Sequence, residues 1–228
     1  MTGRQHRRIS RKAWAAIIIP LAIIALLIGV DRVAAAYAAN QIATKIQGYG
    51  FPVKPGVDVE GFPFLTQVAS RQLDGIVVTA PKFPLGPVTA SVELTATGIA
   101  LNSGYQSGTI AQVNGTGLIA FSSLARLAGV SSAPGLKVSR AGPQTVRLTL
   151  NLQILSASAI ARVTKTGPNE FTIRVISASG VPPSLLGPIR HFTVHIPNLP
   201  EGLAVQTVTV TDRGVLVRIA GRDVPFSS

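Results

Sequence analysis

The sequence predicts an α+β protein that is mainly β: a curved antiparallel sheet with an N-terminal amphipathic helix, placed after a single N-terminal transmembrane helix. Three observations predict this class. An uncharged apolar run follows a basic leader, a helical repeat of apolar residues follows that run, and beyond about residue 57 apolar residues recur at every second position. Because period two is typical of strands and no βαβ alternation occurs, we expect the strands to pair antiparallel.

The first thirty residues have the form of a membrane-targeting segment. Residues 1–12 contain five cations and no acid, and residues 13–30 contain no charge. Eighteen helical residues span about 27 Å, close to the hydrocarbon thickness of a bilayer and longer than the core of a cleavable signal. We therefore expect a basic cytoplasmic leader over 1–12, a transmembrane anchor or signal segment over 13–30, and one extracytoplasmic domain over 31–228. The small residues 34–38 would also allow cleavage.

The next elements follow from apolar spacing. Residues 31–49 repeat apolar side chains at three- and four-residue steps, which predicts an amphipathic helix that continues out of the anchor and ends at Gly48, Gly50 and Pro52. A second short helix is predicted over Phe121–Gly129. Strands are predicted from alternation or from β-branched runs at 57–59, 76–78, 88–96, 146–154, 171–176, 191–196, 203–211 and 215–219, with Thr211–Gly214 as a hairpin turn.

Composition excludes several classes of function. The chain is 46% hydrophobic with a mean hydropathy of +0.40, which is too apolar for a disordered protein. It has no cysteine, so disulfide scaffolds, iron–sulfur clusters and thiolate chemistry are impossible. Beyond the leader and the span, residues 31–228 contain sixteen Lys/Arg and nine Asp/Glu, a net charge of +7. This surplus suits an anionic membrane surface, nucleic acid or an acidic glycan, and the expected topology makes nucleic acid the least favoured of the three.

Catalytic and cofactor motifs are incomplete. Gly115–Ala120 matches a dinucleotide fingerprint, but no acid occurs between Glu93 and Glu170 to bind a ribose, so we interpret these glycines as part of a strand or bulge. A serine nucleophile elbow and a Walker loop are also missing from the sequence. We expect no cofactor and no enzymatic activity.

Two pairs of titratable residues were candidates for a site. His191 and His195 share a strand face but have no third metal ligand beside them, so we expect no metal site. Asp58 and Glu60 also share a strand face, which is more typical of a solvated pair than of a catalytic dyad. An envelope hydrolase would require one of these acids to face one of the histidines in a cleft.

The middle of the chain is basic. No acid occurs from Leu94 to Asn169, and this stretch contains six cations. Such a surface would be attracted to anionic headgroups by on the order of 1 kcal/mol for each nearby cation; the simpler interpretation is a solvated cationic face. A curved antiparallel sheet with one helix can also enclose an apolar cavity, although a filled core is the default.

A family resemblance is carried by two segments. These are Gly61-Phe62-Pro63-Phe64-Leu65-Thr66-Gln67 and, near the end, Leu199-Pro200-Glu201-Gly202-Leu203 with Val208–Thr211. With the basic leader and single span, they make nearly the whole chain resemble the LmeA-like phospholipid-binding family of actinobacterial cell envelopes. The resemblance implies an envelope protein that binds phospholipids and has a role in maintaining mannan-bearing glycolipids. It also implies an elongated fold related to the tubular lipid-binding superfamily.

Candidate ligand contacts follow from residue type alone. In an extended segment Phe62 and Phe64 would lie on one face, with Pro63 denying a ladder hydrogen bond between them, so the segment would suit a sheet edge or a cavity mouth. The alternative is a strand whose phenylalanines fill the core. The predicted apolar wall is Phe62, Phe64 and Leu65, and the predicted headgroup contacts are Arg71, Lys82 and Arg126.

The leading hypothesis is a membrane-anchored, non-enzymatic protein of the cell envelope that binds anionic phospholipid and uses no cofactor. Acyl chains would lie in an apolar interior, and cations at its opening would bind phosphate. The alternative is an adaptor that holds an envelope glycolipid-synthesis or transport enzyme at the membrane without taking up lipid. The first hypothesis requires an interior that is not filled by the protein's own side chains.

Overall fold

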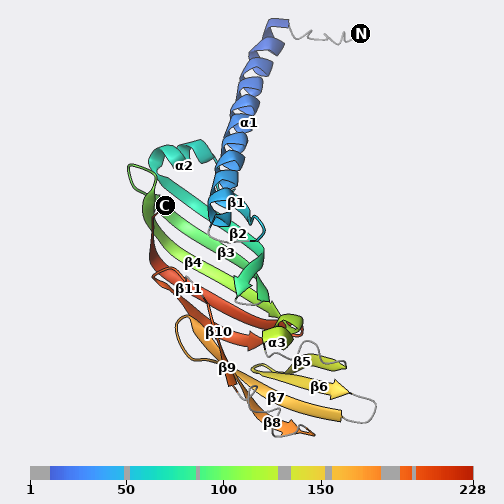
Figure 1. Cartoon of the computed structure of the whole chain (residues 1–228). Coiled ribbons are helices and arrows are strands. Elements are labelled where there is room, and N and C mark those ends of the chain that lie inside the picture. The colour runs from blue at the N-terminus through green and yellow to red at the C-terminus, as the bar shows by residue number, and fades with distance from the viewer. Residues whose placement is uncertain are drawn as a thin grey trace, which may run out of the picture.

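The computed structural model describes residues 11–48, 52–85, 88–127, 135–151, 156–180, 191–196 and 199–227. Figure 1 shows an elongated molecule, in which a long helix projects from one end and a small sheet forms the other end. Most of the remaining described chain is strand, and all pairings are antiparallel. The prediction of a mainly β, antiparallel fold with an N-terminal helix is confirmed.

Helix α1 runs without a break over Arg11–Gln47, so the apolar segment and the amphipathic segment form one rod. From Trp14 to Val30 its large side chains are exposed. Beyond Asp31 every fourth residue is buried, namely Ala35, Ala39 and Ala43. These small side chains let the helix lie close to the first strand, as the predicted amphipathic stripe requires.

The first sheet has six strands in the order β1-β2-β3-β4-β11-β10. It begins at β1 (Gly56–Glu60), continues through the short helix α2 (Phe64–Ser70) into β2 (Gln72–Leu85), β3 (Val88–Leu101) and β4 (Ser107–Ala120), and is completed by β10 (Leu203–Val210) and β11 (Gly214–Ser227). The predicted turn at Thr211–Gly214 joins β10 to β11, where the Thr211 backbone N–H donates to the Gly214 carbonyl at 2.8 Å. β11 pairs along its whole length with β4, so the chain's last strand closes onto a strand formed about a hundred residues earlier.

The second sheet has five strands in the order β5-β6-β7-β8-β9 and is built by the chain between β4 and β10. Helix α3 (Phe121–Leu127) leads into it. Its strands are β5 (Leu136–Gly142), β6 (Thr145–Asn151), β7 (Ser156–Lys165), β8 (Glu170–Ser179) and β9 (His191–His195). Within the described residues neither sheet closes into a barrel, because each has two edge strands.

Three details differ from the sequence prediction. The structure has two sheets where one meandering sheet was expected, because alternation identifies a strand but not its partner. Strands β5 and β7 were not predicted: β7 alternates alanine with serine, and β5 has only Leu136 and Val138 on its apolar face. Of β4, only the segment Gly115–Ala120 was interpreted as part of a strand or bulge. The segment beginning at Phe64 was expected to be extended and is the helix α2. The second predicted helix is confirmed as α3; its last two predicted residues, and residues 152–154 of the predicted 146–154 strand, lie outside the described residues.

One hydrophobic core joins the two sheets. Its fully buried members come from both, with Val205 and Val215 from the first sheet and Val163 and Phe171 from the second. A smaller cluster lies at the α1 end, where Ala35 and Phe64 pack on Leu73 and Ile99. The second sheet is therefore held by shared burial, and the space between the sheets is where an interior cavity can form.

Candidate functional site

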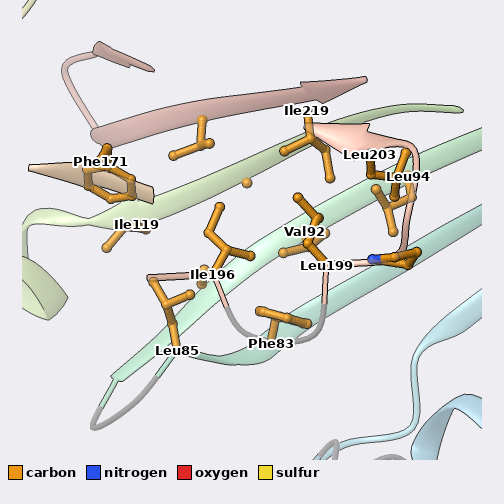
Figure 2. Close-up of a pocket in the computed structure, with 14 residues that line it drawn as sticks. Phe83, Leu85, Val92, Leu94, Ile119, Phe171, Ile196, Leu199, Leu203 and Ile219 are labelled. Atoms are coloured by element: carbon orange, nitrogen blue, oxygen red, sulfur yellow. The ribbon is translucent and has the colours of Figure 1, made fainter. Parts of the chain in front are cut away.

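An apolar cavity lies between the two sheets. Its volume is about 150 Å³. Figure 2 shows side chains of β2, β3, β4 and β11 converging on it from the first sheet. All lining residues are apolar or glycine: Phe83, Leu85, Ala90, Val92, Leu94, Gly117, Ile119, Phe171, Ile196, Leu199, Pro200, Leu203, Val217 and Ile219. The cavity can therefore accept hydrocarbon, and it offers no charged or hydroxyl group that could hold a polar ligand.

The floor of the cavity is set by strand register. Gly117, near the C-terminal end of β4, lies directly opposite Val92 of β3 on one side and Val217 of β11 on the other. Directly opposite residues of a sheet point to the same face, so a glycine between two valines leaves a depression there. The fingerprint-like glycines are thus in a strand, as interpreted, and Gly117 shapes the cavity floor.

Gly115, two residues before Gly117 on the same face of β4, has different surroundings. A Cβ added at Gly115 would collide with the side chains of Leu94 and Ile219, which flank it in the same way. A Cβ added at Gly117 would meet only Val92 Cγ2, at an ordinary contact distance of 3.9 Å. Gly115 therefore allows its neighbours to close over the strand, whereas Gly117 leaves space open.

The opposite wall comes from the second sheet and from the chain that returns to the first. Phe171 of β8 is fully buried, and Ile196 follows β9. Leu199 and Pro200 precede β10, whose first residue Leu203 also lines the cavity. Figure 2 places Leu199 and Leu203 on one side of the cavity and Ile196 between Leu85 and Val92. The cavity is thus bounded by parts of the chain that are far apart in sequence.

Comparison with protein families gives one match. The family model of LmeA-like phospholipid-binding proteins matches residues 29–220 of the 228-residue chain. The chain belongs to the LmeA-like phospholipid-binding family. No curated protein and no solved structure matches it. The resemblance inferred from the sequence is confirmed, and the family is one of binding proteins.

The matched region of this LmeA-like chain begins at the end of the apolar half of α1. Within the described residues, α1 is the one helix long and apolar enough to cross a membrane. Its position near the N-terminus is compatible with a membrane anchor or with a signal sequence. The family match therefore covers both the domain that contains the cavity and the helical segment that connects it to the apolar helix.

Three predicted site residues lie at the α1 end of the molecule and do not line the cavity. Phe64 is buried in the smaller cluster, at 6% exposure. Phe62 and Leu65 are exposed, at 56% and 45%. The expectation that Phe62 and Phe64 share one face is wrong, because α2 begins at Phe64 and turns the two rings apart. The Arg32 guanidinium lies 5.1 Å from the centre of the Phe62 ring and covers it in part.

Helix α2 begins there because of a residue 33 positions before Phe64. Asp31 of α1 is buried, and its carboxylate accepts hydrogen bonds from the backbone N–H groups of Phe64 at 3.0 Å and Leu65 at 2.8 Å. Arg32 donates to the same carboxylate at 2.7 Å and to the Gly61 carbonyl at 3.1 Å. Pro63 at the N-cap has no capping side chain, so Asp31 caps α2 from another helix.

The charge of Asp31 is favoured by this arrangement. Burial by itself would raise the pKa of Asp31, but the hydrogen bonds from Leu65, Arg32 and Phe64 outweigh it and hold the pKa below its ordinary value. Asp31 lies just beyond the uncharged span of residues 13–30. The carboxylate therefore stays ionised and joins α1 to α2.

The three predicted cations are exposed and are spread along the molecule. Arg71 ends α2 in a left-handed conformation with φ of 58°, and its carbonyl accepts a hydrogen bond from Leu101 N–H at 2.9 Å. Lys82 is next to the cavity residue Phe83 on β2. Arg126 lies on α3, two residues after the buried Leu124. The six predicted residues therefore do not form one site, and their role in binding remains a prediction.

The titratable pairs lie on different sheets. Asp58 and Glu60 are exposed on the edge strand β1 of the first sheet. His191 and His195 are exposed on β9, the edge strand of the second, where His195 lies 3.9 Å from Glu170. The structure does not bring these acids and histidines together in a cleft, which was the condition for the hydrolase hypothesis.

Sequence reasoning missed the cavity residues themselves. The signal was present in two places: the closely spaced glycines at 115 and 117, and the closing segment Leu199–Leu203 on which the family resemblance partly depended. Neither could be assigned to a cavity wall without knowing that β4 lies in the middle of the first sheet and that the closing segment crosses from the second sheet to the first. Both facts depend on pairing between residues about a hundred positions apart.

Proposed function

We propose that this chain is a membrane-anchored, non-enzymatic phospholipid-binding protein whose domain lies outside the cytoplasm in the cell envelope, where it supports the maintenance of envelope lipids or lipoglycans. The observation that carries the proposal is an apolar cavity between two open sheets in a member of a phospholipid-binding family. The ligand part of the proposal is that the cavity takes the hydrocarbon of a phospholipid.

The cavity volume limits what is bound in this conformation. A volume of about 150 Å³ lined by aliphatic and aromatic side chains holds a molecule of about the size of benzene. A complete acyl chain is several times larger. The cavity as it stands would accept the end of one chain, and a whole chain requires the two sheets to separate along their shared core, which open sheets permit.

The headgroup must stay outside the cavity, because no lining residue can hydrogen-bond to phosphate through its side chain. Lys82 is the predicted headgroup residue closest in sequence to the cavity wall. We propose that it contacts phosphate at the mouth, and that anionic lipids are therefore preferred. Phe62, Leu65 and Arg71 would instead meet the membrane surface beside the anchor, where exposed aromatic and aliphatic side chains and cations are stabilised together.

A photo-crosslinking experiment tests the ligand site. The full chain, reconstituted in phosphatidylcholine vesicles, is exposed to a phosphatidylglycerol that carries a diazirine at the end of one acyl chain, and the crosslinked peptides are mapped by mass spectrometry. We expect crosslinks in β3, β4 and β11 around Gly117. Replacement of Gly117 by leucine should lower them about tenfold, because the new side chain occupies space otherwise available to about two methylene groups of about 0.8 kcal/mol each.

Gly56→Leu is the matched control. Gly56 is also a strand glycine with room for a Cβ, whose nearest neighbour would be Thr79 O at 3.8 Å, but it lies on the exposed edge strand β1. This variant should crosslink like the parent chain. Crosslinks confined to the transmembrane part of α1, with none between the sheets, would contradict lipid uptake and would favour the adaptor hypothesis.

A further inference from the structure

The outer face of the second sheet is polar and basic. Its inner face contributes Val146, Val163, Phe171 and Ile173 to the core, so the residues that alternate with them along each strand point outward. The outward residues are hydroxyl or charged side chains for the most part. The cations at outward positions are Lys137 of β5, Arg147 of β6, Arg162 of β7 and Arg174 of β8, and all four are exposed.

The strand register places like charges directly opposite each other. Arg162 is the direct partner of Arg174, and Arg174 is the direct partner of His191 on the edge strand. Directly opposite side chains lie about 5 Å apart at Cβ, and like charges in these positions oppose sheet formation. The row formed by Arg162, Arg174 and His191 is therefore unfavourable for the stability of the isolated protein.

No group of the described chain neutralises this row. The ion pairs of the described residues are Arg32–Asp31, Arg140–Asp212 and His195–Glu170. None of them involves Arg147, Arg162 or Arg174, and Glu170 is directed to His195 at the end of β8 away from the row. The guanidinium groups thus keep their donors available for a ligand.

The next row supplies neutral hydrogen-bonding groups. Thr164, Thr172 and Thr193 are direct partners across the same three strands, and the Thr172 and Thr193 hydroxyl oxygens are 3.3 Å apart. Guanidinium groups beside hydroxyl groups on a flat face suit phosphate, which accepts bidentate hydrogen bonds from arginine and single ones from threonine. These groups are spread over the face of an open sheet, so their chemistry fits an extended anionic surface.

The outer face of the second sheet lies far from α1, so it would contact a different surface from the bilayer that holds the anchor. The inner face of the second sheet packs on the first sheet. Helix α1 packs at β1, which is the edge strand of the first sheet opposite to β10. Figure 1 shows α1 and the β5–β8 region at opposite ends of the molecule. A bilayer that contains α1 cannot at the same time cover the outer face of the second sheet.

We infer that the outer face of the second sheet, centred on Arg162 and Arg174, docks on a second anionic phospholipid surface, so that the chain connects two lipid surfaces. The inference rests on the proposed function for the anchor in α1. Its physical basis is charge complementarity between an unneutralised basic row with adjacent hydroxyl groups and the phosphates of an anionic bilayer. A protein in this arrangement would place its lipid cavity between the two surfaces.

A vesicle-capture experiment tests the inference. The full chain is reconstituted in phosphatidylcholine vesicles, and its capture of fluorescent vesicles is measured, with the latter made of phosphatidylcholine alone or mixed with phosphatidylglycerol. We expect capture of the anionic vesicles only, decreasing with added salt. The double variant Arg162→Ser and Arg174→Ser should capture about thirtyfold less, the loss expected for two cations near an anionic surface.

The matched control is Arg213→Ser with Arg222→Ser, which removes the same charge from exposed positions in the first sheet and its turn. It should capture like the parent chain. Equal loss in both double variants would mean that net charge alone attracts the vesicles and would overturn the inference. The Arg162 and Arg174 variant should also unfold at no lower temperature than the parent, since it removes a like-charge pair.

Two further outcomes separate this inference from the proposed function. Tail crosslinks in the cavity without selective capture of anionic vesicles would overturn the docking face and leave lipid binding intact. Selective capture without cavity crosslinks would support the docking face and contradict lipid uptake. Retention of the chain on immobilised hyaluronate, with no capture of anionic vesicles, would assign the face to an acidic glycan and overturn the inference.

Discussion

Single residues decide where the space in this protein lies. Gly115 and Gly117 are two positions apart on the same face of β4, yet the side chains of Leu94 and Ile219 close over the first, while the second is open to the cavity. Only the side chains on neighbouring strands distinguish them. A glycine in a strand normally costs stability through entropy and lost packing, so the two should respond differently to the same substitution.

We expect Gly115→Val to destabilise the fold by about 1–3 kcal/mol, because the new side chain overpacks a site already occupied by Leu94 and Ile219. Gly117→Val should leave the free energy of unfolding unchanged or raise it, since valine favours strands and finds ordinary contacts there. Denaturant unfolding of the two variants measures both effects. A destabilisation of Gly117→Val as large as that of Gly115→Val would contradict the existence of open space beside Gly117.

At this scale the sequence predicted little of the site. Residue type made Phe62, Phe64 and Leu65 attractive as an apolar wall, and the structure puts them at the α1 end. The residues that line the cavity are valines, leucines and glycines of a kind found throughout the chain. What distinguishes them is which side chain lies opposite, and a single sequence does not contain that information. The solvated interpretation of Asp58 and Glu60 is confirmed by their exposure on β1.

At the scale of elements, α2 shows how a short helix can be fixed from outside. Seven residues are too few for a stable isolated helix, and Pro63 supplies no cap. Its first turn is held by the buried carboxylate of Asp31, and Phe64 is packed below it. This explains why the segment was predicted to be extended: the group that makes it helical is 33 residues before Phe64 and belongs to another helix.

We expect Asp31→Ala to lower the hydrogen-exchange protection of the Phe64 and Leu65 amides strongly, while Asp58→Ala, at an exposed position of β1, leaves it unchanged. In the parent chain the hydrogen-exchange protection of these two amides should depend on pH. The pKa of Asp31 is lower in the folded chain than in the unfolded one, so its contribution is complete above the unfolded pKa of about 3.9 and is lost as pH falls through the folded value. Protection factors at neutral and acidic pH measure this. Protection that stays constant in acid would contradict the capping role.

Long, regular elements were the most predictable part of the chain. The continuous α1, the short α3 and most strands follow from periodicity, because an element that packs one face against the core must repeat with its own period. Strand β7 escaped prediction because its first apolar positions are alanines, which give a weak alternation, and β5 because only Leu136 and Val138 mark its apolar face. The division into two sheets also escaped it, because the return of the chain to β10 and β11 is a pairing between distant segments.

At the scale of the whole molecule, three features follow one another along its length: an apolar helix at one end, a cavity between the sheets, and a basic face at the other end. The continuity of α1 matters for this arrangement. Since the helix does not break between its apolar and packed halves, and since Asp31 joins it to α2, the orientation of the domain follows the orientation of the anchor. The topology of the anchor therefore determines what the cavity and the basic face can reach.

Labelling of single cysteines tests that topology, and the chain suits the method because it contains no cysteine. The five cations before the apolar run should keep the N-terminus in the cytoplasm. In intact cells we expect a membrane-impermeant maleimide to label Ser122→Cys, which is exposed on α3, and to label Ser10→Cys in the leader only after permeabilisation. Ser123→Cys, next to it but 4% exposed, controls for accessibility and should react slowly in both states.

The opposite pattern, with Ser10→Cys labelled in intact cells, would put the cavity in the cytoplasm. The proposed envelope role and the second lipid surface would then both be excluded, because each requires the domain to lie on the outer side of the membrane that holds α1.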